Sequence, residues 1–119
     1  MNAKLDDLIG LLREELQHYG ELLALLDQQQ EQIIQRASDD VINTSAAIDA
    51  QLVITQTSRA ARDASYAKLC EAAGLPGDAA FKAVSKHLPE ARRAQIEALI
   101  QENNALLLRV QARARQNHV

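Results

Sequence analysis

The sequence predicts an all-α protein, an elongated three- to four-helix bundle made of a long antiparallel helical hairpin, a short helix and a C-terminal amphipathic helix. Leu and Ala supply most of the 47% hydrophobic residues, whereas aromatic residues make up only 3%. No segment alternates apolar and polar side chains at the period of two that a strand requires. Four Gly and two Pro are the only strong helix breakers, so residues 1–119 are expected to form a single helical domain.

The first predicted helix covers residues 5–37, where apolar side chains recur at alternating steps of four and three residues. This average repeat of 3.5 residues places a narrow apolar stripe on one side of a helix. Such a helix would be about 50 Å long, which predicts an elongated molecule. Leu11, Leu22 and Leu25 lie off the stripe, which favours a second partner helix over a partly apolar surface. The stripe consists of Leu5, Ile9, Leu12, Leu16, Tyr19, Leu23, Leu26, Gln30, Ile33 and Ala37.

A second helix of nearly equal length is predicted over residues 39–73, as an antiparallel hairpin requires. Ser38 is a good N-cap, and Asp39 and Asp40 would place two carboxylates in the positive first turn. We therefore expect a tight corner near Ala37 rather than one continuous helix through Val41.

Polar residues dilute the apolar stripe of this second helix, because Thr55, Arg59 and Arg62 share its face through the middle. The first interpretation is a mostly solvated central turn, in which the long Arg stems lie along the neighbouring helix. In the alternative, one of the two Arg residues pairs with an acidic residue of the first helix, such as Glu15 or Glu21. The apolar members of the face are Val41, Ile48, Leu52, Tyr66, Leu69 and Ala73.

The clearest break in the sequence is Gly-Leu-Pro-Gly at residues 74–77. Gly74 can adopt the left-handed cap conformation, and Pro76 cannot continue a helix. A short helix is predicted over residues 78–87, with Asp78 as its cap. Its small apolar face is expected to plug the open end of the hairpin, and consists of Phe81, Val84 and Leu88.

The last helix is predicted over residues 89–116, with Pro89 at its first position. It is expected to be strongly amphipathic, with Asn103 in its apolar stripe, where a polar residue lowers stability but fixes register and partner. Three long helices are not expected to cover one another fully, so some apolar surface should remain for another partner. The stripe runs through Ile96, Ile100, Asn103, Leu107, Val110 and Ala114, flanked by Leu99 and Leu106.

Composition argues against several kinds of partner. A net charge of −3 with both signs interspersed gives no basic field, which argues against nucleic acid. The longest apolar run, residues 22–26, is far shorter than the roughly 20 residues that cross a bilayer, and the acidic start does not resemble a signal peptide. We therefore expect a cytoplasmic protein without membrane insertion. The single Cys70 is interpreted as a small core residue.

No catalytic motif is evident, since the one Cys and three His are isolated and no metalloprotease, hydrolase or phosphate-binding pattern occurs. Glu14, Glu15 and His18 have helical spacing, but a metal site would need further ligands from a second helix. These three residues are interpreted as a solvated face. No enzymatic activity, cofactor or metal is expected.

Residues 99–107, Leu-Ile-Gln-Glu-Asn-Asn-Ala-Leu-Leu, resemble the last-helix signature of the FlgN family, the cytoplasmic chaperones of bacterial flagellar export. The Leu pairs and Glu residues of the first helix, at 11–15 and 22–26, are also similar to the family, as is an Arg at position 59 or 62. The sequence departs from the family at Ile100, where a second Asn is frequent, and at positions 49–50, near which a Lys is frequent. Many members also continue into a flexible tail beyond this helix.

The resemblance implies a chaperone that binds the C-terminal helical segments of hook-associated (hook-filament junction) proteins, keeps them from assembling, and delivers them to the type III export gate. The alternative is a structural helical adaptor or a self-associating coiled coil, hence a homo-oligomer. An amphipathic helix with a spare apolar face suits the binding of another helix. The candidate cargo-binding residues lie on the last helix, although they could instead form intramolecular core: Leu99, Ile100, Asn103, Leu106, Leu107 and Val110.

Overall fold

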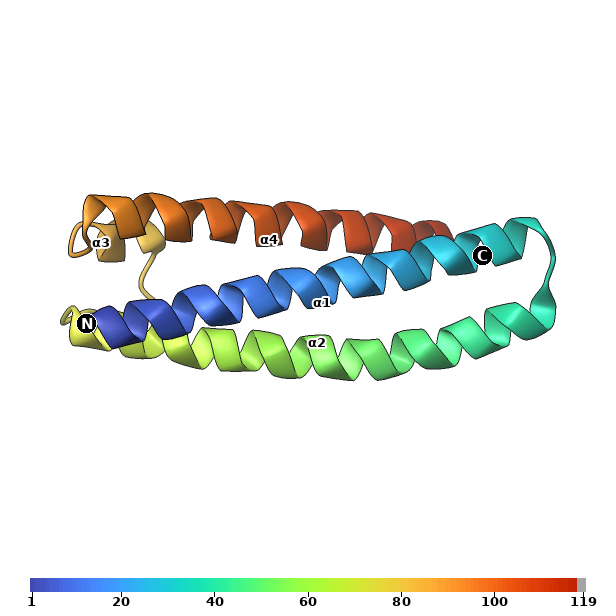
Figure 1. Ribbon diagram of the computed structural model, residues 1–119, viewed down its shortest axis with the longest axis horizontal. Coiled ribbons are helices and arrows are strands. Elements are labelled where there is room, and N and C mark those ends of the chain that lie inside the picture. The colour runs from blue at the N-terminus through green and yellow to red at the C-terminus, as the bar shows by residue number, and fades with distance from the viewer. Residues whose placement is uncertain (118–119) are drawn as a thin grey trace.

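The computed structural model describes residues 1–117, and the all-α prediction is confirmed. The helices are α1 (Asn2–Ile34), α2 (Ser38–Ala72), α3 (Phe81–Ser85) and α4 (Glu90–Asn117), and no strand occurs within residues 1–117. The molecule is a rod with extents of 54 × 20 × 20 Å (Figure 1), so the elongated shape is confirmed as well.

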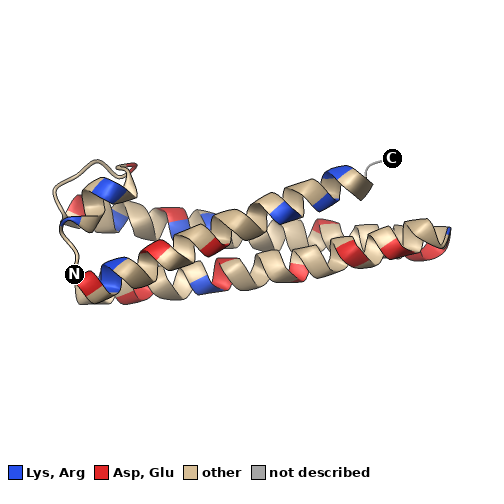
Figure 2. Ribbon diagram, turned by 90° about the horizontal axis from the view of Figure 1, so that it is seen from above, with Lys and Arg blue, Asp and Glu red and all other residues tan. Residues whose placement is uncertain are grey.

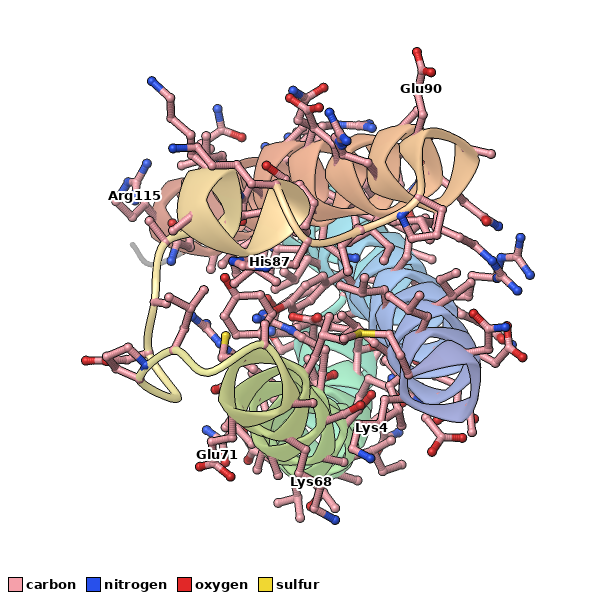
Figure 3. The ribbon with its side chains drawn as sticks, turned by 90° about the vertical axis from the view of Figure 1, so that its left-hand side faces the viewer. Lys4, Lys68, Glu71, His87, Glu90 and Arg115 are labelled. Carbon is pink, nitrogen blue, oxygen red and sulfur yellow. The ribbon has the colours of Figure 1, made fainter. Side chains whose placement is uncertain are left out.

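The central helix of the rod is α1, which packs against both α2 and α4, while the backbones of α2 and α4 approach each other at almost no point. The second partner helix predicted for α1 is therefore α4. The first hairpin is antiparallel, whereas α4 runs parallel to α1 (Figure 1). Viewed along the rod, the three long helices occupy the corners of a triangle, and α3 lies in front of α4 at the end that faces the viewer (Figure 3).

The corner between α1 and α2 is closed by the backbone alone. Arg36 adopts a positive φ of 57°, and the amides of Arg36 and Ala37 bond back to carbonyls in the last turn of α1. The prediction of Ser38 as N-cap is wrong: Ala37 occupies the cap without a side-chain hydrogen bond, and Ser38 is already helical. These backbone bonds end α1 at Ile34, three residues before the predicted end.

The α2–α3 connection begins as predicted, because Gly74 has a φ of 76° and its amide bonds back to the last turn of α2. The helix after it is shorter than predicted, and Asp78 does not cap it. The amide of Ala79 bonds to the carbonyl of Pro76, which forms a turn, and the hydroxyl of Tyr66 donates to the carbonyl of Ala79. This turn occupies residues 76–79, so that α3 starts only at Phe81.

Two apolar clusters fill the rod. The first lies at the α3 end, where Val84 of the short helix and Leu88 after it join residues of the hairpin; Cys70 is fully buried there, as expected. Its buried members are Leu5, Leu8, Ile9, Leu12, Leu69, Cys70, Val84, Leu88, Ile96 and Leu99. The second cluster lies towards the hairpin corner and comprises Tyr19, Leu22, Leu23, Leu26, Ile48 and Val110.

Polar contacts extend from the hairpin corner to the middle of the α1–α2 interface. Thr44 donates to Gln32 at 2.7 Å, and Gln51 donates to Glu21 at 3.2 Å. Leu52, which was predicted to lie on the buried face of α2, is 39% exposed. Polar side chains thus take part of the buried face of α2. Thr44 and Gln51 find partners on α1, whereas the hydroxyl of Thr55 donates to the carbonyl of Gln51 within α2.

The seam of α4 against α1 differs from the predicted one. Leu99 is buried in the first cluster, whereas Ile100 and Leu107 are only half-buried. Asn103 donates to the carbonyl of Leu12 at 3.0 Å, and Asn117 donates to that of Leu26 at 2.7 Å. The packed seam of α4 therefore runs through Leu99, and the predicted stripe mixed residues of two faces.

Candidate helix-binding groove

A groove with α1 as its floor and α2 and α4 as its walls runs along the rod as two hollows. The first hollow measures about 260 Å³ and is closed at one end by Phe81 of α3; the second measures about 270 Å³. Arg59 lines both. The main lining residues are Leu8, Leu12, Tyr19 and Leu22 of α1; Leu52, Thr55, Arg59, Arg62 and Tyr66 of α2; and Ile100, Asn104, Leu107, Gln111 and Ala114 of α4.

The lining residues follow the same repeat on all three helices. On α4 five lining residues, from Ile100 to Ala114, are spaced by steps of four, three, four and three, and on α2 five, from Leu52 to Tyr66, by three, four, three and four. Gln56 and Val110 also line the second hollow and lie beside these two stripes. On α1 the lining residues are Leu8, Leu12, Tyr19 and Leu22, and the buried Glu15, which lines neither hollow, occupies the position between Leu12 and Tyr19 that completes the same spacing. A 3.5-residue repeat that faces an open position on three helices is the geometry of a four-helix bundle that lacks one helix.

A buried ion pair occupies the centre of the floor. The carboxylate of Glu15 is 1% exposed and accepts hydrogen bonds from Arg62 Nε at 2.8 Å, Arg62 Nη2 at 3.0 Å and the Tyr19 hydroxyl at 2.7 Å. The alternative that paired an Arg of α2 with an acidic residue of α1 is therefore confirmed, and the solvated central turn is wrong. Placing Glu15 on a solvated face was also wrong, because three donors compensate its desolvation.

The two tyrosines that line the groove stay protonated far above neutral pH. Burial, together with the hydrogen bond to Glu15, raises the pKa of Tyr19 to about 12. Burial also raises the pKa of Tyr66 to about 12. Both hydroxyls therefore act as hydrogen-bond donors at physiological pH, Tyr19 within the floor and Tyr66 towards the loop that precedes α3.

Arg59 is the charge in the groove that the fold leaves unpaired. It is exposed, and within residues 1–117 it forms no ion pair, whereas Arg62 pairs with both Glu15 and Asp63. Acidic residues predominate from Glu14 to Asp49, where Arg36 is the one Lys or Arg (Figure 2), whereas the charged residues that line the groove are Arg59 and the paired Arg62. The positive charge of the groove is thus local to Arg59.

Comparison with protein families assigns this chain to a family. The family model described as FlgN protein matches residues 1–119. The chain belongs to the FlgN family. Membership supports a role as a flagellar export chaperone, and the family is not known for enzymatic activity. Searches of curated proteins and of solved structures gave no significant match.

The residues proposed from the sequence for cargo binding fall on two faces of α4 in this FlgN-family protein. Leu99, Asn103 and Val110 are buried against α1. Leu106 is half-buried against the second cluster. Ile100 lines the first hollow, and Leu107 lines the second. Val110, although buried, also lines the second hollow, so the groove includes three of the six predicted residues.

Sequence reasoning missed the contribution of α2 to the groove of this FlgN-family chain. Leu52 lines the second hollow and was assigned to the packed face, and Arg59 was treated as part of a solvated turn. One pattern in the sequence could have indicated this contribution. Arg59, a residue type that is usually exposed, lies seven positions after Leu52 and seven before Tyr66. That spacing marks a second stripe beside the packed one.

The described residues offer no alternative chemistry. Among residues 1–117, no group of three or more His, Cys, Asp or Glu side chains is placed to hold a metal ion. None of the described helices combines the length and apolar character needed to cross a bilayer.

Proposed function

We propose that this chain is a cytoplasmic chaperone that binds the C-terminal helical segments of hook-associated proteins and delivers them to the flagellar export gate. The observation that carries the proposal is the groove, which offers the place of a fourth helix beside α1, α2 and α4. Family membership supports the general role. By covering such a segment, the chaperone would keep it from assembling before export.

Of the six residues predicted from the sequence, Ile100 and Leu107 are the ones we assign to direct cargo contact. Both are half-buried and line the groove, so a docked helix would cover their remaining surface. Complete burial of a Leu or Ile is worth roughly 1.5–3 kcal/mol, of which the fold has already gained a part. We assign Leu99, Asn103 and Val110 a supporting role, since they hold α4 on α1.

Two substitutions on α4 test the proposal. Leu107→Asp should weaken binding of the C-terminal segment of a hook-associated protein by about tenfold or more, because a carboxylate would replace an apolar contact. Leu108 is 66% exposed and projects roughly 100° away from Leu107, outside the groove, so Leu108→Asp should bind normally. Titration calorimetry measures the affinities, and circular dichroism verifies that both variants remain folded.

The results discriminate between a binding site and a purely structural role of α4. If Leu107→Asp lowers the melting temperature sharply and loses binding only as it unfolds, Leu107 belongs to the core of the fold. If both variants stay folded and bind cargo like the wild type, the last helix is not the site.

The second candidate function is a self-associating helical adaptor. Ile42, Val53 and Ile54 on α2 are exposed apolar side chains outside the groove lining, and a second copy could cover them. Light scattering coupled to size exclusion distinguishes the two candidates. A tight homodimer that ignores hook-associated segments would favour self-association over the chaperone.

A further inference from the structure

We infer that the helix which fills the groove carries an apolar heptad stripe of two heptads with one carboxylate at its centre, and that Arg59 binds this carboxylate. The inference rests on the proposed function only for the source of the helix, a hook-associated protein. The recognition chemistry follows from the groove itself.

The position of Arg59 fixes where the carboxylate must lie. The lining of α2 extends from Leu52 to Tyr66, and Arg59 stands seven residues from either end. On α4 the lining extends from Ile100 to Ala114, with Leu107 at the middle position. Each wall therefore spans two heptads, about 21 Å of helix at 1.5 Å per residue, and Arg59 marks the midpoint.

The floor has the same midpoint. Its lining runs from Leu8 to Leu22, and Glu15 is the central position. Because Arg62 and the Tyr19 hydroxyl already bind the Glu15 carboxylate, that charge is compensated within the fold. The residues that line the two hollows include no carboxylate, and Arg62 is already paired with Glu15, so Arg59 is the one formal charge of the groove that a docked helix must satisfy.

A docked helix would change the surroundings of Arg59. It is solvated in the free protein, but a helix in the groove would displace part of its water. A guanidinium that loses water needs a partner, and a carboxylate can accept two parallel hydrogen bonds from it. A Lys at the same place would add repulsion between like charges. The central position suits either chain direction of the incoming helix, since it is equidistant from both ends.

Apolar contacts would flank this charge on both sides. About two turns from the level of Arg59, the groove presents Tyr66 and Ile100 in the first hollow, and Leu22 and Leu52 in the second. These contacts supply affinity through burial, while the central pair selects among amphipathic helices by charge. The occupant is thus an apolar heptad helix with an acidic centre, not a basic or uniformly apolar one.

Three designed peptides provide the test. Each has 21 residues with Leu at the heptad positions, and they differ only at the central stripe position, which is Glu, Gln or Lys. Fluorescence anisotropy measures their binding to the wild-type chain and to Arg59→Glu. We expect the wild type to prefer the Glu peptide over the Lys peptide by about tenfold, and Arg59→Glu to reverse this order.

A matched control carries the same charge change outside the groove. Lys68 is an exposed residue of α2 that lines a different hollow, between α1 and α2, so Lys68→Glu should keep the wild-type preference. Arg59 makes no ion pair within residues 1–117, so its substitution should leave the helical content unchanged.

Several results would overturn the inference. They are equal binding of the three peptides, a preference that Arg59→Glu does not reverse, absence of peptide binding, and a dimer in which a second copy fills the groove. A parallel titration with the C-terminal segment of a hook-associated protein separates this inference from the proposed function. If that segment binds wild type and Arg59→Glu equally, only the inference fails; if it does not bind but the designed peptides show the reversal, only the proposed function fails.

Discussion

Removing the cation of the buried pair in the groove floor should destabilise the protein strongly. In Arg62→Met the carboxylate of Glu15, which is 1% exposed, would lose both guanidinium hydrogen bonds. Only the hydroxyl of Tyr19 would still donate to it. We expect the free energy of unfolding to fall by about 3 kcal/mol.

The magnitude follows from the surroundings of the pair. Removing one partner of a buried ion pair costs about 3–5 kcal/mol, because the other charge stays buried without compensation. The side chain of Arg62 is 22% exposed, so water screens part of the interaction. The remaining bond from Tyr19 offsets a further part of the loss. Both effects place the expected value at the lower end of the range.

A second substitution should restore most of the lost stability. Glu15→Gln in the Arg62→Met background removes the buried charge, while the amide oxygen can still accept from the Tyr19 hydroxyl. The free energy of unfolding of the double variant should therefore lie within about 1 kcal/mol of the wild-type value. Arg59→Met is the matched control, because it makes the same change at an exposed residue with no ion pair within residues 1–117.

Urea unfolding followed by circular dichroism near neutral pH measures these differences. With a slope of about 1–3 kcal/mol per molar urea, a loss of about 3 kcal/mol lowers the midpoint by roughly 1–3 M. The reasoning is refuted if Arg62→Met unfolds at the same urea concentration as Arg59→Met, or if the double variant is no more stable than Arg62→Met.

Three further predictions concern the corner, the tyrosines and the α1–α4 seam. Arg36→Gly should raise stability by about 1 kcal/mol, because Gly adopts a positive φ without a steric penalty; Arg36→Ala should give no such gain in a urea titration. The raised pKa values of Tyr19 and Tyr66, about 12 in the folded state against an ordinary value of about 10, favour the protonated folded form. The stabilisation of the folded protein by these two tyrosines should be complete below a pH of about 10 and should disappear as the pH rises to about 12. The ultraviolet absorbance of tyrosinate measures the ionisation, and its appearance near a pH of about 10 in a protein that is still helical would contradict the prediction. Asn103→Asp should lower the free energy of unfolding, measured in urea, by about 2 kcal/mol or more, because a carboxylate cannot donate a hydrogen bond to the carbonyl of Leu12 in α1. Asn104→Asp makes the same change at an exposed position and should leave this free energy nearly unchanged.

Local signals in the sequence were sufficient to predict the helices and most of their ends. The Gly74 cap was predicted correctly, since a residue that favours positive φ before Pro76 leaves the helix few alternatives. The corner at Arg36 was harder to assign, because a positive φ at Arg has no sequence signature. Ser38 has a better N-cap side chain than Ala37, but the backbone hydrogen bonds at the end of α1 form the turn without it.

The register of the α4 seam could not be predicted from the sequence alone. Adjacent apolar residues, Leu99 with Ile100 and Leu106 with Leu107, allow two heptad stripes that differ by one position. Both stripes contain Asn103, so the polar residue does not distinguish them. The choice depends on where α1 lies, which is a tertiary property.

The ion pair in the floor was difficult to predict for a related reason. A Glu and an Arg are each typical of a solvated helix face, and their burial becomes favourable only when they meet. Glu15 and Arg62 are separated by 47 residues and lie on different helices. Helical periodicity within one segment therefore carried no information about their contact, although the pairing of the two helices made it one of the alternatives.

The same adjacent apolar pairs that made the register ambiguous give α4 two faces, one for α1 and one for the groove. Asn103 and Asn117, fourteen residues apart, donate to the carbonyls of Leu12 and Leu26, which are also fourteen residues apart. These two hydrogen bonds hold α4 parallel to α1 in one register. The central groove positions of the two helices are therefore aligned without a partner, so a helix that binds there need not order the wall that it contacts.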